Sequence, residues 1–211
     1  MIKYLIFDLD NTLYSSRHGL ELNVKERLKS FCSDLLGIPP DEAWQMRRAA
    51  SQYGTCLEWL MAEKGFTDIE AYMSAAHPKD EADKLPHDTD LRIFLSDIRL
   101  PKAILTNSPR EHADLILDKL GIAKLFTHIF DIRASNFIGK PRREVYENAL
   151  TTLKVAAKEA LFIDDMPAYV EAFAGMGGKA LLFDENNVHE KCSVRKIRKL
   201  TEIRKFIGLR A

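Results

Sequence analysis

Short apolar runs that stop abruptly at polar residues are the feature that most constrains this fold. The clearest run, residues 4–7, ends at Asp8. Similar runs recur at 103–105, 129–130, 160–163 and 180–183. Strands buried on both faces of a parallel sheet have this uninterrupted apolar character, whereas strands with one wet face alternate. The runs therefore predict a parallel sheet.

Stretches with helical spacing separate these runs. Residues 111–120 carry a one-sided apolar pattern with Gly121 as a C-cap, and residues 142–153 follow Pro141. A further helical stretch covers residues 167–174. Because strand and helix alternate, we expect an α/β fold in which helices cover both faces of the sheet.

The segment from residue 16 to residue 86 breaks this alternation, since it contains no convincing strand. Helical candidates lie there at 22–36, 41–53, 55–64 and 67–76. We therefore expect an α/β core of residues 1–15 and 87–211 and an inserted all-helical domain of residues 16–86. A chain of 211 residues is long enough for one domain with such an insertion.

The C-terminal residues 189–211 are basic, with eight Lys or Arg minus two Glu giving +6. The whole chain has 31 basic and 31 acidic residues, so the remaining residues carry −6. Apolar residues recur in this segment every three positions, at Val194, Ile197, Leu200, Ile203 and Phe206. This stripe predicts an amphipathic helix, which we expect to pack on the sheet rather than bind an anionic partner.

Composition argues against several classes of function. A formal net charge of zero disfavours broad nucleic-acid binding. Asp8 and Asp10 interrupt the N-terminal apolar run, and no stretch of about 18 apolar residues occurs, so neither a signal peptide nor a membrane span is expected. The three cysteines form no CxxC pair and the six histidines no HxxxH or HExxH motif, which disfavours disulfides and a zinc site. We expect a cytoplasmic protein without nucleic-acid or membrane partners.

Four polar motifs lie where predicted strands end or a helix begins. They are Asp8-Leu9-Asp10-Asn11-Thr12, Leu105-Thr106-Asn107-Ser108, Gly139-Lys140-Pro141 and Phe162-Ile163-Asp164-Asp165. Ligands bind at the carboxyl edge of open α/β sheets. Each motif alone also has a structural explanation as a cap, a turn or a solvated charge, and for Ser108 we favour an N-cap of the helix after Pro109.

The four motifs together predict a magnesium and phosphate site. Three or four carboxylates at one sheet edge repel each other unless a cation lies among them. Carboxylates with water are typical Mg²⁺ ligands. Lys140 and the Thr106 hydroxyl opposite that ion would suit the phosphate that accompanies it.

In this order the motifs and the helical insertion resemble the haloacid dehalogenase-like hydrolase superfamily, from Lys3 to about Phe183. The resemblance implies a Rossmann-like core and a cap domain of the C1 type. A narrower similarity links the chain to the pyrimidine 5′-nucleotidase branch. It rests on residues 7–14, the pair Tyr53-Gly54, and residues 105–107 and 162–165.

The resemblance implies a role for each matching residue. Asp8 would be the nucleophile that forms an aspartyl-phosphate, and Asp10 the general acid and then the general base. The presence of Asp10 favours a phosphatase over a haloacid dehalogenase. Thr106 would hydrogen-bond the transferring phosphoryl group, and Lys140 would neutralise its charge.

The same resemblance implies the metal ligands. Mg²⁺ would be held by Asp8, by the main-chain carbonyl of Asp10, and by Asp165 with help from Asp164. Between the last two, register with the family favours Asp165 as the main ligand. Tyr169 stands where the family often has Asp or Asn, which leaves an outer contact of the site undetermined.

Specificity is expected to come largely from the cap. The candidates for substrate contacts are Tyr14, Arg47, Arg48, Gln52, Tyr53 and, in the core, Asn107. Tyr53 could stack on a base and an arginine could meet an anionic group. The alternative is that the arginines are solvated helix charges and that Trp44 and Trp59 form the core of the cap.

These inferences predict Mg²⁺-dependent hydrolysis of a small phosphorylated metabolite, with a nucleoside 5′-monophosphate as the main candidate. The first alternative substrate is phosphoglycolate or a small sugar phosphate. A different class of function, a binding or regulatory protein without turnover, is also compatible with this fold.

Overall fold

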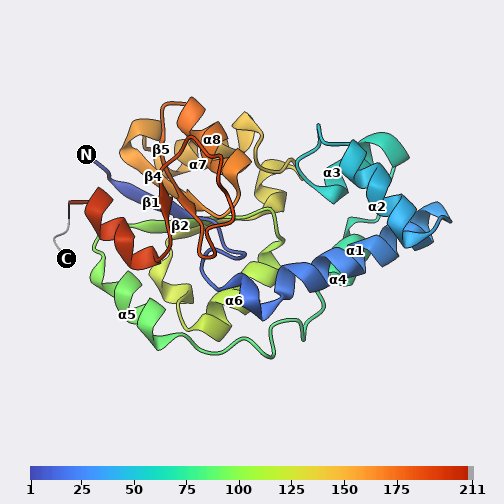
Figure 1. The fold of residues 1–211 in the computed structure, drawn as a ribbon, viewed down its shortest axis with the longest axis horizontal. Coiled ribbons are helices and arrows are strands. Elements are labelled where there is room, and N and C mark those ends of the chain that lie inside the picture. The colour runs from blue at the N-terminus through green and yellow to red at the C-terminus, as the bar shows by residue number, and fades with distance from the viewer. Residues whose placement is uncertain (209–211) are drawn as a thin grey trace.

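A six-stranded sheet forms the centre of the computed structural model, which describes residues 1–208 (Figure 1). All neighbouring strands are parallel, in the order β3-β2-β1-β4-β5-β6. The strands are β1 (Tyr4–Phe7), β2 (Lys102–Leu105), β3 (His128–Phe130), β4 (Ala160–Asp164), β5 (Lys179–Phe183) and β6 (Lys196–Ile197). Every residue of β1, β2 and β4 is buried, as predicted for the apolar runs 4–7, 103–105 and 160–163 that these strands contain.

Helices cover both faces of this sheet. Helices α5 (Thr89–Asp97), α6 (Arg110–Leu120), α7 (Arg143–Leu153) and α8 (Pro167–Gly175) do so, and the other α-helices are α1 (Leu20–Leu36), α2 (Pro40–Ala49), α3 (Cys56–Lys64) and α4 (Ile69–Ala76). Alternate residues of β1 enter separate cores: Leu5 and Phe7 pack with α5 and α6, and Tyr4 and Ile6 pack with α7 and α8. The expected α/β fold is confirmed.

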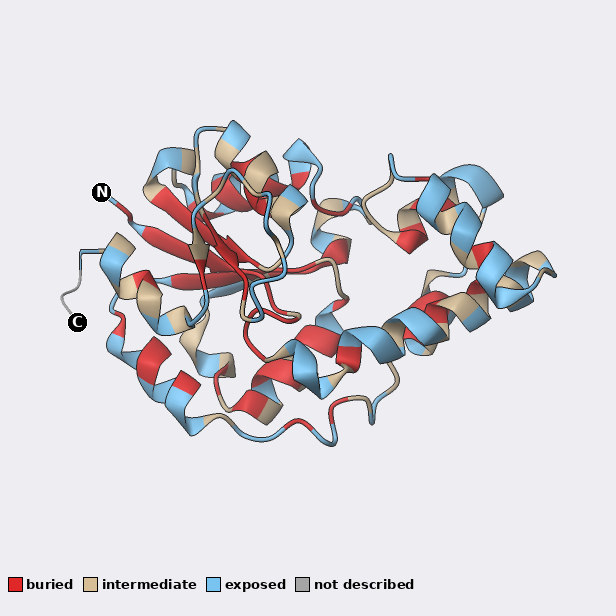
Figure 2. Ribbon diagram, in the orientation of Figure 1, coloured by how far each residue is buried: buried red, intermediate tan, exposed pale blue. Residues whose placement is uncertain are grey.

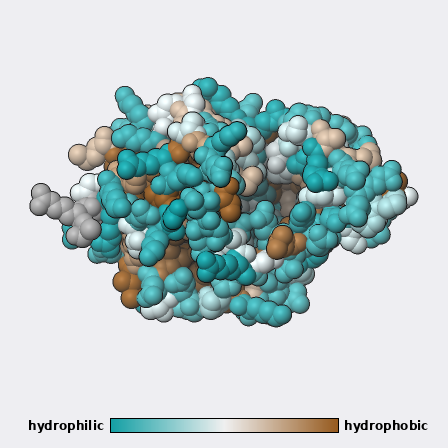
Figure 3. Space-filling view, viewed as in Figure 1, coloured by the Kyte–Doolittle hydropathy of each residue, from teal (hydrophilic) through white to brown (hydrophobic). Residues whose placement is uncertain are grey.

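The strands and the helices differ in their exposure to solvent. Figure 2 shows buried strands and helices whose outer faces are exposed. The molecular surface on this side is largely hydrophilic, with smaller hydrophobic areas (Figure 3). Among the described residues, no helix combines the length and the apolar character that crossing a membrane requires.

Four helices, α1 to α4, form a cap beside the sheet (Figure 1). They enclose an apolar cluster of their own, which includes Cys32, Trp59 and Leu60, with Trp44 packed against it. Ile132 of the core contributes to the same cluster. The predicted helical cap is confirmed, while its boundaries at residues 16 and 86 stay a prediction.

The predicted C-terminal amphipathic helix is wrong. Lys196–Ile197 form the edge strand β6, and the 3₁₀ helix η5 covers Leu200–Phe206. A repeat of three residues matches the three residues per turn of a 3₁₀ helix. Ile197 and Ile203 are buried in the core, so the apolar stripe packs on the body of the protein. Arg210, one of the basic residues of this segment, lies outside the described residues.

Two further differences concern helices. The second cap helix ends at Ala49 rather than near residue 53. Helix α5, just after the cap, is absent from the sequence prediction. Its Asp88 N-cap accepts a hydrogen bond from the main-chain N–H of Leu91 at 2.8 Å, a local signal that the sequence does contain.

Candidate active site

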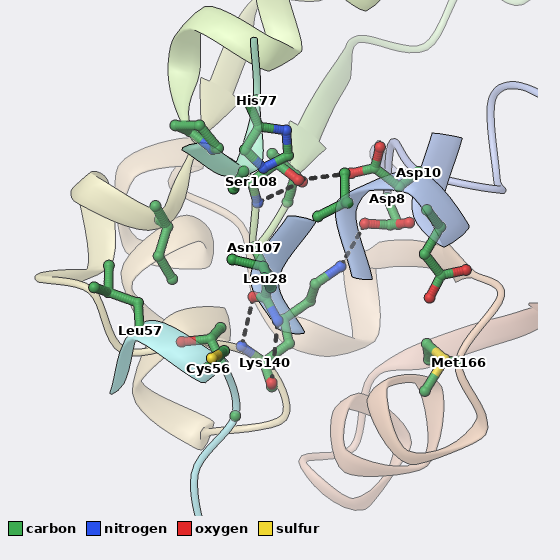
Figure 4. A pocket seen from close by; sticks show the side chains of 18 of the residues that line it. Asp8, Asp10, Leu28, Cys56, Leu57, His77, Asn107, Ser108, Lys140 and Met166 are labelled. Carbon is green, nitrogen blue, oxygen red and sulfur yellow. Dashed lines mark hydrogen bonds and ion pairs between the residues drawn. The ribbon is translucent and has the colours of Figure 1, made fainter. Parts of the chain in front are cut away.

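The loops after β1, β2 and β4 meet at the carboxyl edge of the sheet. These strands are neighbours, and Phe7 is in register with Ile104 on one side and with Ile163 on the other. Asp8, which follows Phe7, therefore lies beside the ends of both neighbouring strands. A cavity of about 290 Å³ opens here between the sheet edge and the cap. Figure 4 shows Leu57 and Cys56 of the cap on the opposite side of this pocket from Asp8.

Lys140 binds two carboxylates beneath the cavity. Its Nζ lies 2.6 Å from Oδ1 of Asp8 and 2.6 Å from Oδ2 of Asp164. The lysine and Asp164 are fully buried, and the ammonium also lies 5.0 Å from the centre of the Tyr169 ring. Burial disfavours the charged lysine, but the two carboxylates outweigh it and raise the pKa of Lys140 above its ordinary value. The side chain is therefore a permanent cation at the base of the site.

Three carboxylates lie close together at this edge of the sheet. Asp8, Asp164 and Asp165 each offer an oxygen within 4.8 Å of the other two. Burial, only partly offset by Lys140, raises the pKa of Asp8 to about 8. Burial, with repulsion from Asp8 and Asp164, raises the pKa of Asp165 to about 9. A divalent cation bound among these oxygens would offset the repulsion between the carboxylates, so the cluster is a suitable donor set for such an ion.

The two aspartates at the end of β4 have different surroundings. Asp164 accepts hydrogen bonds from Lys140 and, at 2.8 Å, from the main-chain N–H of Met166. The carboxylate of Asp165 lines the cavity and has no hydrogen bond or ion pair within residues 1–208. Asp165 is thus the carboxylate without a protein partner among these residues, and its role as the main metal ligand stays a prediction.

Asp10 is held by three donors. Its Oδ1 accepts from the Tyr14 hydroxyl at 2.5 Å and from His112 Nε2 at 2.7 Å, and its Oδ2 accepts from the Ser108 hydroxyl at 2.8 Å. Burial opposes ionisation, but the charge of His112 and the three hydrogen bonds lower the pKa of Asp10 below its ordinary value. Asp10 is therefore a fixed carboxylate.

The expected N-cap role of Ser108 is wrong. Helix α6 has Pro109 at its N-cap, and no side chain caps it from that position. Instead, Asp131 accepts a hydrogen bond from the main-chain N–H of Arg110 at 3.1 Å. The Ser108 hydroxyl is free to bind Asp10 because a distant carboxylate supplies this contact.

His112 links Asp10 to a group that sequence reasoning missed. Its Nδ1 lies 2.5 Å from Oε1 of Glu81, and Nδ1 of His77 lies 3.2 Å from the same oxygen. Glu81 also accepts from Arg27 of α1 at 3.1 Å. The available signals were the four-residue spacing of His77 and Glu81 and the position of His112 on the apolar face of α6.

Thr106 and Asn107 have distinct roles at the end of β2. The Thr106 hydroxyl lines the cavity and accepts a hydrogen bond from the main-chain N–H of Ser108 at 3.0 Å. Asn107 also lines the cavity, but its amide holds the main chain of Lys140: the Lys140 N–H donates to Oδ1 at 2.8 Å, and Nδ2 donates to the Lys140 carbonyl at 3.2 Å (Figure 4). Its Nδ2 also donates to the Tyr169 hydroxyl at 3.3 Å.

Most cap candidates lie elsewhere. Arg47 lines the cavity, yet its guanidinium donates to the carbonyls of Ala50 and Tyr53 at 3.2 and 3.3 Å. Arg48 is exposed and Tyr53 packs in the cap cluster, and neither lines the cavity. The cap side of the cavity is instead mainly apolar, formed by Val24, Leu28, Trp44, Leu57, Tyr72 and Met73.

The remaining two candidates are engaged in other contacts. The Tyr14 hydroxyl binds Asp10, and Tyr14 lies outside the cavity lining. Gln52 donates to the carboxylate of Glu63 at 3.2 Å, within the cap.

Comparison with known proteins identifies related chains. Residues 2–177 match the family model of haloacid dehalogenase-like hydrolases. Validoxylamine A 7′-phosphate phosphatase of Streptomyces hygroscopicus subsp. limoneus is 31% identical over 186 residues, which cover 82% of this chain and 81% of that protein. Phosphate metabolism protein 8 of Saccharomyces cerevisiae is 30% identical over 190 residues. That match covers 83% of this chain but only 59% of the yeast protein.

A solved structure supports the same fold. The HAD-hydrolase YfnB from Bacillus subtilis, determined with bound magnesium, superposes with a TM-score of 0.66 over 99% of both chains. At 16% sequence identity, this likeness bears on the fold alone.

Proposed function

Because the chain belongs to the haloacid dehalogenase-like hydrolases and is similar to a named phosphatase, we propose that it hydrolyses small phosphate monoesters with Mg²⁺, through an aspartyl-phosphate on Asp8. The observation that carries this proposal is the pairing of Asp8 with Lys140 at 2.6 Å, beside the uncommitted carboxylate of Asp165. A nucleophilic carboxylate, a buried cation and a cation-binding carboxylate are what phosphoryl transfer needs.

The chemistry proceeds in two displacements at phosphorus. An oxygen of Asp8 attacks the phosphorus, the bond to the leaving oxygen breaks, and that oxygen takes a proton from Asp10. Water then attacks the phosphorus of the aspartyl-phosphate and one of its protons passes to the Asp10 carboxylate, while the bond from phosphorus to the Asp8 oxygen breaks, which releases phosphate and regenerates the Asp8 carboxylate. The second step thus returns to Asp10 the proton that the first step uses, and the ionised Asp10 of the structure corresponds to the form between the two steps.

Other side chains supply positioning and charge. The Thr106 hydroxyl accepts from Ser108, so its own proton is available to donate to a phosphoryl oxygen. Lys140 neutralises charge next to Asp8. Asp8, Asp165 and the main-chain carbonyl of Asp10, with Asp164 behind them, would hold Mg²⁺. The ion would supply charge stabilisation for the phosphoryl group when bound.

The cavity favours a compact substrate. Its volume of about 290 Å³ is at the low end for ligand pockets, which occupy roughly 300–1,000 Å³. We therefore propose a small phosphorylated metabolite, such as phosphoglycolate or a small sugar phosphate. A nucleoside 5′-monophosphate is the second candidate, which the aromatic rings of Trp44 and Tyr72 in the lining favour.

A substrate panel tests this proposal. Phosphate release is measured from phosphoglycolate, sugar phosphates, UMP and CMP, with Mg²⁺ and after chelation by EDTA. We expect turnover that is lost with EDTA and in Asp8→Asn, whereas Asp34→Asn, at an exposed site on α1, retains it. Full activity of Asp8→Asn would contradict the nucleophile assignment. A preference for UMP and CMP would select the second candidate.

A further inference from the structure

The carboxylate of Asp10 is one end of a buried chain that leads to the cap. His112 of α6 lies between Asp10 and Glu81. Its Nε2 is 2.7 Å from Oδ1 of Asp10, and its Nδ1 is 2.5 Å from Oε1 of Glu81. The side chains of His112 and Glu81 are 1% and 2% exposed. Glu81 follows α4, the last cap helix, and His77 at the C-cap of that helix contacts it. Asp10 is thus connected to the cap through a single imidazole ring.

Glu81 is itself fixed from the other side. Arg27 of cap helix α1 donates to Glu81 at 3.1 Å and, through Nε, to the carbonyl of Ala76 at 2.8 Å. The His112 ring therefore has no freedom to turn without losing a charged hydrogen bond at each nitrogen. Since the ring and the Glu81 carboxylate are buried, the bond between them defines the position of the ring strongly.

The same three groups, His77, Glu81 and His112, satisfy the distance limits of a metal site. The separation of 2.5 Å between His112 Nδ1 and the Glu81 oxygen is, however, shorter than the roughly 2.7–2.9 Å of an ordinary charge-assisted N–H···O hydrogen bond. Two ligands at about 2.0–2.1 Å on a tetrahedral zinc ion lie farther apart than this. The geometry fits a hydrogen-bonded chain.

We propose that His112, held by Glu81, is a positioning residue for Asp10: it fixes the carboxylate that protonates the leaving oxygen and ties that position to the cap. This inference rests on the proposed function, which gives Asp10 its acid–base role. Ser108, in the loop after β2, and Tyr14, two residues after the first motif, orient the same carboxylate. Of the three side chains that bind Asp10 within residues 1–208, only His112 connects it to a group that follows the cap helices.

A pair of near-isosteric variants separates the two bonds of His112. The amide of His112→Gln can replace Nε2 and still donate to Asp10, while that of His112→Asn replaces Nδ1 and keeps only the contact with Glu81. Both are compared as kcat/KM on an alkyl phosphate and on p-nitrophenyl phosphate, whose leaving group needs no proton. His18→Asn, at an exposed site outside the chain of contacts, is the control.

We expect His112→Asn to lose about 100-fold on the alkyl phosphate and less than about 10-fold on p-nitrophenyl phosphate, with unchanged KM. His112→Gln should recover most of the loss. A merely structural role predicts equal losses on both substrates, and that result would overturn the proposal. Glu81→Gln gives a second test, with a smaller loss of the same leaving-group dependence, if His112→Asn does not fold.

Failure of this inference is distinguishable from failure of the proposed function. A wild-type protein that releases no phosphate from any ester would overturn the function itself. An active wild type, with a leaving-group-dependent loss in Asp10→Asn but none in His112→Asn or Glu81→Gln, would overturn only the role of His112.

Discussion

The Cβ atom that Gly54 lacks would lie 2.6 Å from the main-chain oxygen of Lys140. Gly54 belongs to the cap loop before α3, and Lys140 to the core loop before α7. The contact is reciprocal, because a Cβ on Gly139 would lie 2.5 Å from Cγ2 of Thr55. Main chain of the cap therefore packs directly on the loop that carries the buried lysine.

Replacing this glycine should disturb the site without unfolding the protein. In Gly54→Ala, the added methyl group must push the cap loop away from residues 139–140, and we expect kcat/KM to fall by roughly 10- to 100-fold, since small misplacements of a catalytic group cost this much. Gly175→Ala is the matched control, because its Cβ would meet nothing within 4 Å. Equal activity of the two variants would show that this contact does not position Lys140.

The charge of Lys140 should stabilise the fold as well as the chemistry. Lys140→Met keeps much of the volume but leaves Asp8 and Asp164 buried without a counter-charge, which costs about 3–5 kcal/mol when such carboxylates are ionised. Protonation relieves this cost, so the loss in free energy of unfolding should be larger at pH 8 than at pH 5. Urea unfolding measures it, with exposed Lys158→Met as control. A loss independent of pH would contradict the ion-pair explanation.

Asp164 and Asp165 should respond differently to the same substitution. Asp165→Asn removes a free carboxylate, so we expect weaker Mg²⁺ binding and, in EDTA, unchanged or higher thermal stability. Asp164→Asn removes a partner of Lys140 and should lower the stability in EDTA. Calorimetric Mg²⁺ titration and thermal unfolding of both variants test this. The reverse pattern would make Asp164 the main ligand.

Magnesium affinity should rise with pH. In the metal-free protein the pKa values of Asp8 and Asp165 are about 8 and about 9, so both carboxylates are largely protonated at pH 6. Binding must displace these protons, which weakens affinity at low pH and strengthens it until pH passes about 9. Titration calorimetry in two buffers with different ionisation enthalpies measures the protons released. An affinity equal at pH 6 and pH 8 would contradict the raised pKa values.

The sheet was predictable from the sequence because burial on both faces leaves a direct mark, an uninterrupted apolar run. The structure of the C-terminal segment could not be predicted, since an apolar residue at every third position fits an α-helix and a 3₁₀ helix alike. The two residues of β6 are a strand only because they pair with β5, a contact that no local pattern encodes.

The candidate site, too, could be predicted from the sequence only in part. Asp8, Thr106 and Asp165 follow strands, so the topology of a parallel sheet brings them together. The contact between Glu81 and His112 joins residues 31 positions apart in two separate segments, without a shared local pattern. The bonds of Arg47 to the carbonyls of Ala50 and Tyr53 could not be predicted, because they depend on where α2 ends.

The central claim is that Asp8 becomes phosphorylated during turnover. Asp10→Asn, which should slow hydrolysis of the aspartyl-phosphate, is mixed with Mg²⁺ and p-nitrophenyl phosphate, whose leaving group needs no proton from Asp10, quenched in acid, and digested for mass spectrometry. We expect the added mass of one phosphoryl group on the peptide that contains Asp8, and none in Asp8→Asn. Phosphate release by wild type, together with no adduct at Asp8 or an adduct at another residue, would contradict the claim.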